Sequence, residues 1–176
     1  MVDVAYPLAN VLDIVEGFPT VDLQTGANTG DWVNIKNSDW VTILFRSGVG
    51  TAGDDPTVTV QQASDISGTG AKALNIVTSP LQVFSKQAAT SLAAVTTWSD
   101  ASGGVTTNTW TDADSAEQSL LLAIMFKASD LDVDNGFDTI RATIADVGGN
   151  AQPGDLLYIM SPMYGSKPTE TPSYIS

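Results

Sequence analysis

Short segments in which polar and apolar residues alternate recur along the chain, and turns rich in Gly, Asp and Pro separate them. Residues 57–63 (TVTVQQA) alternate most clearly, as expected of a strand with one buried face. There are about seven to nine such segments at a spacing of roughly ten residues, a pattern typical of antiparallel sandwiches and barrels. The sequence therefore predicts an all-β fold: an antiparallel β-sandwich, Greek-key or jelly-roll-like, with extended N- and C-terminal arms.

One apolar run, residues 120–126 (LLLAIMF), does not alternate. Its length suits a central strand that is buried on both faces, although a helix beginning near residues 115–118 would explain the same run. The alternating segments before and after it favour the strand.

Residues 1–29 differ in composition from the rest of the chain and have no clear hairpin partner. We interpret them as an N-terminal arm that runs over the domain or onto a neighbouring molecule. An ordinary edge strand with a frayed terminus is the alternative. Residues 30–162 then form the β-sandwich domain, and residues 163–176 an irregular C-terminal tail. The apolar side chains of the arm are candidate interaction residues: Val11, Ile14 and Phe18.

The composition excludes many catalytic chemistries. The 176 residues include no Cys and no His, so zinc sites, thiol catalysis and Ser-His-Asp triads each lack a required residue type. The formal net charge of −13 disfavours binding to a phosphate backbone. No segment approaches the roughly 18 apolar residues of a membrane span, and the first residues lack the features of a signal peptide. We therefore expect synthesis in a cytoplasm, with no cofactor, no nucleic-acid partner and no membrane contact.

The acidic cluster at residues 130–138 (DLDVDNGFD) resembles the first half of a calcium-binding loop. The match then fails, because Asn135 stands where the loop requires Gly and Arg141 stands where it requires Glu. We interpret the cluster as a tight turn in which Asp and Asn side chains bond the backbone and Gly136 has a positive φ. Binding of an adventitious cation by residues 130–138 is the open alternative.

Paired carboxylates could also serve a glycosidase, which needs two acids on either side of a sugar. The pairs available are Asp54 with Asp55, and those within the set Asp130, Asp132 and Asp134. Acids in turns are usually solvated, and nothing in the pattern indicates a cleft around them. We therefore expect no enzymatic activity, and the sequence predicts neither a catalytic nor a metal-ligating residue.

Two tryptophans, Trp98 and Trp110, lie in a Thr- and Ser-rich region around Ser102-Gly103-Gly104. Each could cover one end of the core. Alternatively, each could make an intermolecular contact, since Trp is enriched at interface hot spots. We retain both tryptophans as candidate interaction residues.

Two parts of the chain resemble a family of structural proteins of tailed bacteriophages and prophages. They are residues 30–37 with 50–63, and residues 131–138 with 145–148. The segment GTAGDDP at residues 50–56 is the most specific. The resemblance implies a virion component, specifically a capsid decoration (cement) protein. Such proteins are small β-rich domains that assemble, often as trimers, on the outer face of the major capsid lattice, and the resemblance carries over no catalytic residue.

The expectation is thus a non-enzymatic virion structural protein, made in the host cytoplasm and located on the capsid exterior. Its partners would be the major capsid protein and further copies of itself, in a trimer. Removing residues 1–20 would then abolish capsid attachment and leave the core folded. The alternative is a carbohydrate-binding or host-recognition module of a tail or fibre, in which Trp98 and Trp110 stack on sugars. A hydrolase that uses Asp132 and Asp134 is a third hypothesis.

Overall fold

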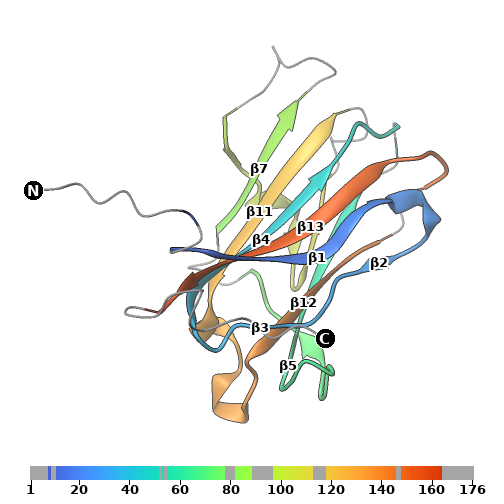
Figure 1. Cartoon of the computed structure of the whole chain (residues 1–176). Helices are drawn as coiled ribbons and strands as arrows, with labels where there is room; N and C mark the ends of the chain where they lie inside the picture. The colour runs from blue at the N-terminus through green and yellow to red at the C-terminus, as the bar shows by residue number, and fades with distance from the viewer. Residues whose placement is uncertain are drawn as a thin grey trace, which may run out of the picture.

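The chain forms two antiparallel β-sheets that pack face to face (Figure 1). The computed structural model describes residues 8, 11–51, 53, 55–77, 82–88, 97–112, 118–145 and 148–163. The helical segments that lie wholly within these ranges are single turns of three residues each: Leu23–Thr25, Ser102–Gly104, Ala128–Asp130 and Val133–Asn135. None of the helices in this described part is long and apolar enough to cross a membrane. The prediction of an all-β antiparallel sandwich is confirmed.

One sheet has six strands, in the order β1-β13-β4-β11-β7-β8. Their bounds are β1 (Asp13–Asp22), β13 (Pro153–Pro162), β4 (Ser38–Ser47), β11 (Ser119–Lys127), β7 (Gln82–Ala88) and β8 (Ser99–Asp100). The seven-stranded sheet has the order β2-β12-β5-β10-β9, with β3 also beside β12 and β6 beside β5. Its bounds are β2 (Asn28–Thr29), β12 (Thr139–Ile144), β5 (Thr57–Ala63), β10 (Thr109–Thr111), β9 (Val105–Thr106), β3 (Val33–Asn34) and β6 (Lys72–Ala73).

The strand pairings are nested: the first strand of the chain pairs with the last, and each following pair lies between the two strands of the previous pair in the sequence. β1 pairs with β13, β2 and β3 pair with β12, β4 pairs with β11, and β5 pairs with β10, all antiparallel. Successive pairs belong alternately to the two sheets. Nested pairing across two sheets is the jelly-roll arrangement, one of the two topologies expected from the sequence. β7 and β8 come from the connection between β5 and β10, and they widen the six-stranded sheet.

The apolar run at residues 120–126 forms most of β11, between β4 and β7, so the strand prediction is confirmed over the helix. Its core-facing side chains are fully or almost fully buried: Leu120, Leu122, Ile124 and Phe126. Leu121 and Met125 point to the opposite side of the sheet and are half-buried. The run is therefore apolar on both faces, but the seven-stranded sheet covers only one of them.

The segment interpreted as an N-terminal arm contains β1, which pairs along β13 from Asp13 opposite Met160 to Asp22 opposite Pro153. Phe18 on this strand is 8% exposed and belongs to the core. For residues 13–22 the structure therefore shows the edge strand that was the alternative to an arm. Removing residues 1–20 would take away most of β1 together with Phe18, so the structure argues against the expectation that the core stays folded without them. Residues 1–7, 9–10 and 164–176 of the two predicted ends lie outside the described part.

Tyr158 on β13 is the largest fully buried side chain, and its hydroxyl connects the two sheets. The hydroxyl accepts a hydrogen bond from the backbone N–H of Ala142 at 2.9 Å and donates one to the carbonyl of Asp31 at 3.1 Å. Burial raises the pKa of Tyr158 above its ordinary value of 10.0. β2 and β3 both pair with β12, and residues 30–32 separate these two short strands. At this interruption the hydroxyl of Tyr158 accepts the hydrogen bond from Ala142 of β12 that a neighbouring strand would otherwise accept.

Candidate interaction surface

The side of the six-stranded sheet that faces away from the core carries a group of apolar side chains at its centre, with polar and charged side chains among and around them. Directly opposite residues of antiparallel strands point to the same face, so the register identifies this set. One row across the strands runs Glu16, Leu157, Leu44, Ala123, Phe84. The next row runs Ile14, Ile159, Thr42, Met125. We call this surface the apolar outer face, and it consists of Ile14, Leu44, Phe84, Leu121, Ala123, Met125, Leu157 and Ile159.

Figure 1 shows β1, β13, β4, β11 and β7 side by side as one broad layer, with β12 and β5 in the other layer. Most side chains of the apolar outer face are half-buried, and Ile14 is 44% exposed. Two tryptophans lie at its margins. Trp40 is 36% exposed, with Lys127 5.0 Å from its ring centroid, and Trp98 is 43% exposed, with Lys86 5.1 Å from its ring centroid.

The outer face of the seven-stranded sheet is polar rather than apolar. A continuous row of threonines crosses five of its strands: Thr29, Thr143, Thr59, Thr109 and Thr106. We call it the threonine face. A polar outer face is what an antiparallel sheet in contact with water normally has. The two outer faces of the same molecule thus differ, and only the threonine face has the composition of a solvated surface.

Counted over the residues that the structure describes, the apolar outer face is also electrically neutral in a strongly acidic chain. Three acidic residues, Glu16, Asp100 and Asp155, point outward on it together with three basic residues, Arg46, Lys86 and Lys127. These charges cancel, whereas the whole chain has a net charge of −13. The excess negative charge therefore lies elsewhere on the molecule.

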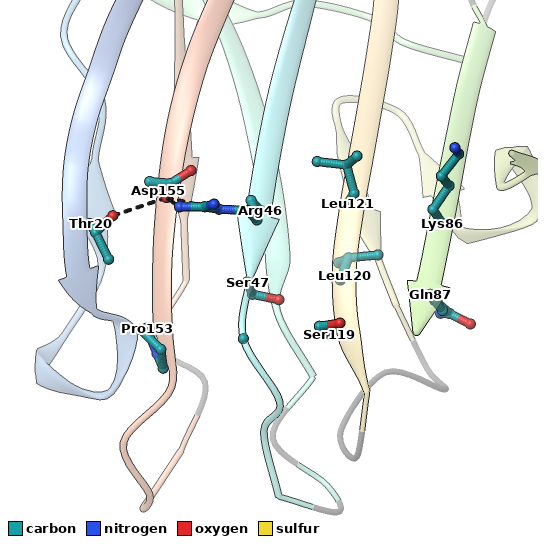
Figure 2. A pocket seen from close by; sticks show the side chains of 11 residues that line it. Thr20, Arg46, Ser47, Lys86, Gln87, Ser119, Leu120, Leu121, Pro153 and Asp155 are labelled. Atoms are coloured by element: carbon teal, nitrogen blue, oxygen red, sulfur yellow. Dashed lines mark hydrogen bonds and ion pairs between the residues drawn. The ribbon is translucent and has the colours of Figure 1, made fainter. Parts of the chain in front are cut away.

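A cavity of about 490 Å³ lies at the end of this sheet where β1 and β7 finish. Figure 2 shows one row of its lining side chains crossing five strands: Thr20, Asp155, Arg46, Leu121 and Lys86. Asp155 accepts hydrogen bonds from the Thr20 hydroxyl at 3.0 Å and from Nε of Arg46 at 3.1 Å, and it forms an ion pair with Arg46. The lining of the cavity combines one acid with two cations and the apolar side chains of Leu120, Leu121 and Pro153. This set of groups suits binding of a polar or acidic surface group.

The structure separates the interaction residues that the sequence predicted. Ile14 and Trp98 lie at opposite margins of the apolar outer face, and Val11, 40% exposed, comes just before β1. Trp110 is only 3% exposed, and its Nε1 donates to the carbonyl of Ala101 at 2.9 Å. Trp110 and Phe18 thus lie in the core, where a partner does not reach them. For Trp110, this burial matches the alternative of a side chain that covers the core.

Sequence reasoning missed the centre of the surface, which is formed by Leu44, Leu121, Leu157 and Ile159. A signal for it was present, because β4, β11 and β13 contain apolar residues at consecutive positions rather than only at alternate ones. In an antiparallel sheet, consecutive apolar residues indicate two apolar faces.

The acidic cluster at residues 130–138 is built as a turn. Asp130 accepts a hydrogen bond from the backbone N–H of Lys127 at 2.9 Å, and Gly136 has a φ of 81°. Asp132 is bound by Lys72 and by Asn135, and the hydrogen bond from Lys72 lowers the pKa of its carboxyl. The tight-turn prediction is confirmed. Within the described ranges, no three acidic side chains come together as a metal site, and Asp54 lies outside those ranges.

Comparisons of the chain with protein-family models, with curated proteins and with solved structures find no match. The surfaces of the molecule are therefore the basis for assigning a function. Among them, the apolar outer face departs furthest from what a sheet in contact with water requires.

Proposed function

We propose that the chain is a non-enzymatic structural protein of a tailed-bacteriophage virion. Its role is that of a capsid decoration (cement) protein, which assembles on the outer face of the major capsid lattice and stabilises the head. The observation that carries this proposal is the apolar outer face, which acts as an assembly interface within the coat.

The size of the apolar outer face supports a role in assembly. Five strands at about 4.8 Å spacing and three rows of side chains outline an area of roughly 500 Å², in which the apolar side chains lie beside Glu16, Arg46 and Lys86. The largest apolar patch on a monomeric protein is about 300–600 Å² and is often functional, so a surface of this size is a candidate site of interaction. Covering such a patch removes apolar area from water, at about 25 cal/mol per Å².

The virion setting rests on the resemblance of residues 30–37, 50–63 and 131–138 to phage structural proteins. The jelly roll is compatible with it, since this topology occurs in viral capsid proteins and also in lectins. Fold alone does not give function, so the surface has to separate these two classes. A neutral apolar sheet face with an acidic remainder suits a coat protein that is soluble and adheres only at a matched patch.

The test compares two matched variants on particles. Leu44→Glu places a charge at the centre of the apolar outer face, and Thr59→Glu places the same charge at the centre of the threonine face. Particles produced with each variant are purified, and the number of copies per particle is counted by quantitative mass spectrometry. Circular dichroism confirms that both variants are folded.

We expect Leu44→Glu to weaken binding to the particle at least about tenfold, which corresponds to roughly 1.4 kcal/mol of binding free energy, and so to lower the number of copies per particle. Thr59→Glu should leave it close to that of the wild type. Equal occupancy of both variants would contradict the role of the apolar outer face. Absence of the wild-type chain from particles would contradict the virion function itself.

A second function, carbohydrate binding by a tail or fibre module, is favoured by one observation. Trp98 presents an exposed ring at the sheet margin, with Lys86 beside it. Trp110 is buried and takes no part in this alternative. A glycan array identifies ligands, and saturable quenching of Trp fluorescence that Trp98→Ala abolishes would favour sugar binding. A silent array would remove this alternative.

A further inference from the structure

We propose that the apolar outer face binds the same face of a second copy of this chain, giving a two-fold symmetric dimer with sheet packed on sheet. The inference rests on the proposed function only in taking this face as an assembly interface, and it names the partner. Face-to-face packing of two sheets about 10 Å apart is a standard arrangement inside sandwiches.

The charges on the face are distributed as such a dimer requires. Glu16 lies at the β1 edge, and Lys86 lies on β7 toward the opposite edge. A two-fold axis parallel to the strands places β1 of one copy over β7 of the other. Glu16 of each copy then lies within about one row of Lys86 of its partner, a row being about 7 Å. The same pairing occurs twice, as an isologous interface demands.

The remaining charges are matched within each copy. The axis passes over β4, so the Arg46 side chains of the two copies lie opposite each other, and each is neutralised by Asp155 of its own copy. Lys127 lies over Trp40 at one end, and Asp100 on β8 accepts a hydrogen bond from the backbone N–H of Ser102 at 2.8 Å. Each of these four charges therefore has a partner within its own copy.

The net charge of the chain selects this face for self-association. Each copy has a net charge of −13, so a contact through most other surfaces would bring like charges together. On the apolar outer face three acidic and three basic residues cancel, so two copies can meet there without this local repulsion. The long-range repulsion that is left is screened by salt.

The area agrees with a dimer of moderate affinity. Two patches of roughly 500 Å² each would bury about 1,000 Å² in total, near the lower limit for a specific interface. The interface would therefore form reversibly as the protein concentration rises. This two-fold dimer differs in symmetry from the trimer that the resemblance implied, so the number of copies is part of the test.

The experiment is sedimentation equilibrium of the purified full chain from about 1 μM to about 1 mM, the range of weak to moderate affinities. We expect a monomer–dimer equilibrium whose dimer is strengthened by added salt. Leu44→Glu should weaken it at least about tenfold, and Thr59→Glu should change it less than about threefold. Glu16→Lys and Lys86→Glu should each weaken the dimer, and the double variant should recover the wild-type dissociation constant to within about threefold.

Three outcomes would overturn the inference: a monomer at every concentration, a trimer, or a dimer that Leu44→Glu leaves intact. Failure of the double charge exchange to restore association would overturn the proposed orientation. The proposed dimer and the proposed virion function can fail separately. A monomeric chain whose Leu44→Glu variant leaves particles would show that the face binds the lattice. A dimeric chain that never joins particles would support the dimer and contradict the virion function.

Discussion

The backbone N–H of Ala142 on β12 donates a hydrogen bond of 2.9 Å to the hydroxyl of Tyr158 on β13, and so links the two sheets through the core. The same hydroxyl donates to the carbonyl of Asp31 at 3.1 Å. A phenol thus completes the hydrogen bonding of β12 where its neighbouring strand is interrupted. A buried backbone N–H without such a partner would be costly.

Tyr158→Phe removes this hydroxyl and keeps the ring. The N–H of Ala142 then loses its partner, so we expect the free energy of unfolding to fall by about 1–3 kcal/mol. Urea denaturation followed by circular dichroism measures the change. Wild-type stability in the Phe variant would show that the hydroxyl is not needed to satisfy β12.

The stability of the protein should also fall at alkaline pH because of Tyr158. Burial raises the pKa of its hydroxyl in the folded state above the ordinary value of 10.0, which the unfolded chain retains. The unfolded state therefore ionises first, and the stabilisation is complete below about pH 10 and is lost as the pH rises above it.

Lysines also titrate in this range, so the informative quantity is a difference. We expect the urea midpoint of the wild type to decrease more steeply than that of Tyr158→Phe between about pH 9 and pH 11. Parallel decreases in the two proteins would contradict the assignment.

Gly30 lies beside the same hydroxyl, and its position leaves no room for a side chain. A Cβ there would lie 2.8 Å from the carbonyl oxygen of Ala142 and 2.8 Å from the hydroxyl of Tyr158. We expect Gly30→Ala to destabilise the fold by about 1–3 kcal/mol, as overpacking in cores does. Gly103→Ala is the control, because a Cβ at Gly103 meets nothing within 4 Å. Similar melting temperatures for the two variants would contradict this account of Gly30.

The two tryptophans of the Thr- and Ser-rich region should respond oppositely to substitution. Trp110 is buried and hydrogen-bonded, so Trp110→Ala should lower the free energy of unfolding by about 3–5 kcal/mol. Trp98 lies at the margin of the sheet, so Trp98→Ala should change it by less than about 0.5 kcal/mol. Thermal denaturation measures both. Comparable losses in the two variants would show that Trp98 also supports the core.

Much of the fold follows from local pattern, because a strand of an antiparallel sheet buries every second residue. The alternation at residues 57–63 and the apolar run at 120–126 predicted β5 and β11 in this way. β1 pairs with β13 and so joins the two ends of the domain, and no local sequence pattern indicates this long-range pairing. This is why Phe18 could be taken as part of an arm.

The surface was harder to predict than the fold. Trp98 and Trp110 have similar neighbours in the sequence, and only the pairing of Trp110 with Val58 on β5 shows that it faces the core. Leu44 and Phe45 are adjacent apolar residues, and the register alone shows which of them faces outward. The net charge follows from composition, but only the three-dimensional arrangement shows that the apolar outer face is free of the excess negative charge.

The central claim is that the apolar outer face is covered when the protein assembles. Hydroxyl-radical footprinting with mass spectrometry tests it directly, on dilute protein, on concentrated protein and on particles. Trp40, Trp98 and Met125 report on the face, and Met163, which is 52% exposed and not part of that face, is the internal control. We predict that oxidation of the first three falls on assembly while oxidation of Met163 stays constant. Unchanged oxidation of Trp40, Trp98 and Met125 in the assembled state would contradict the account.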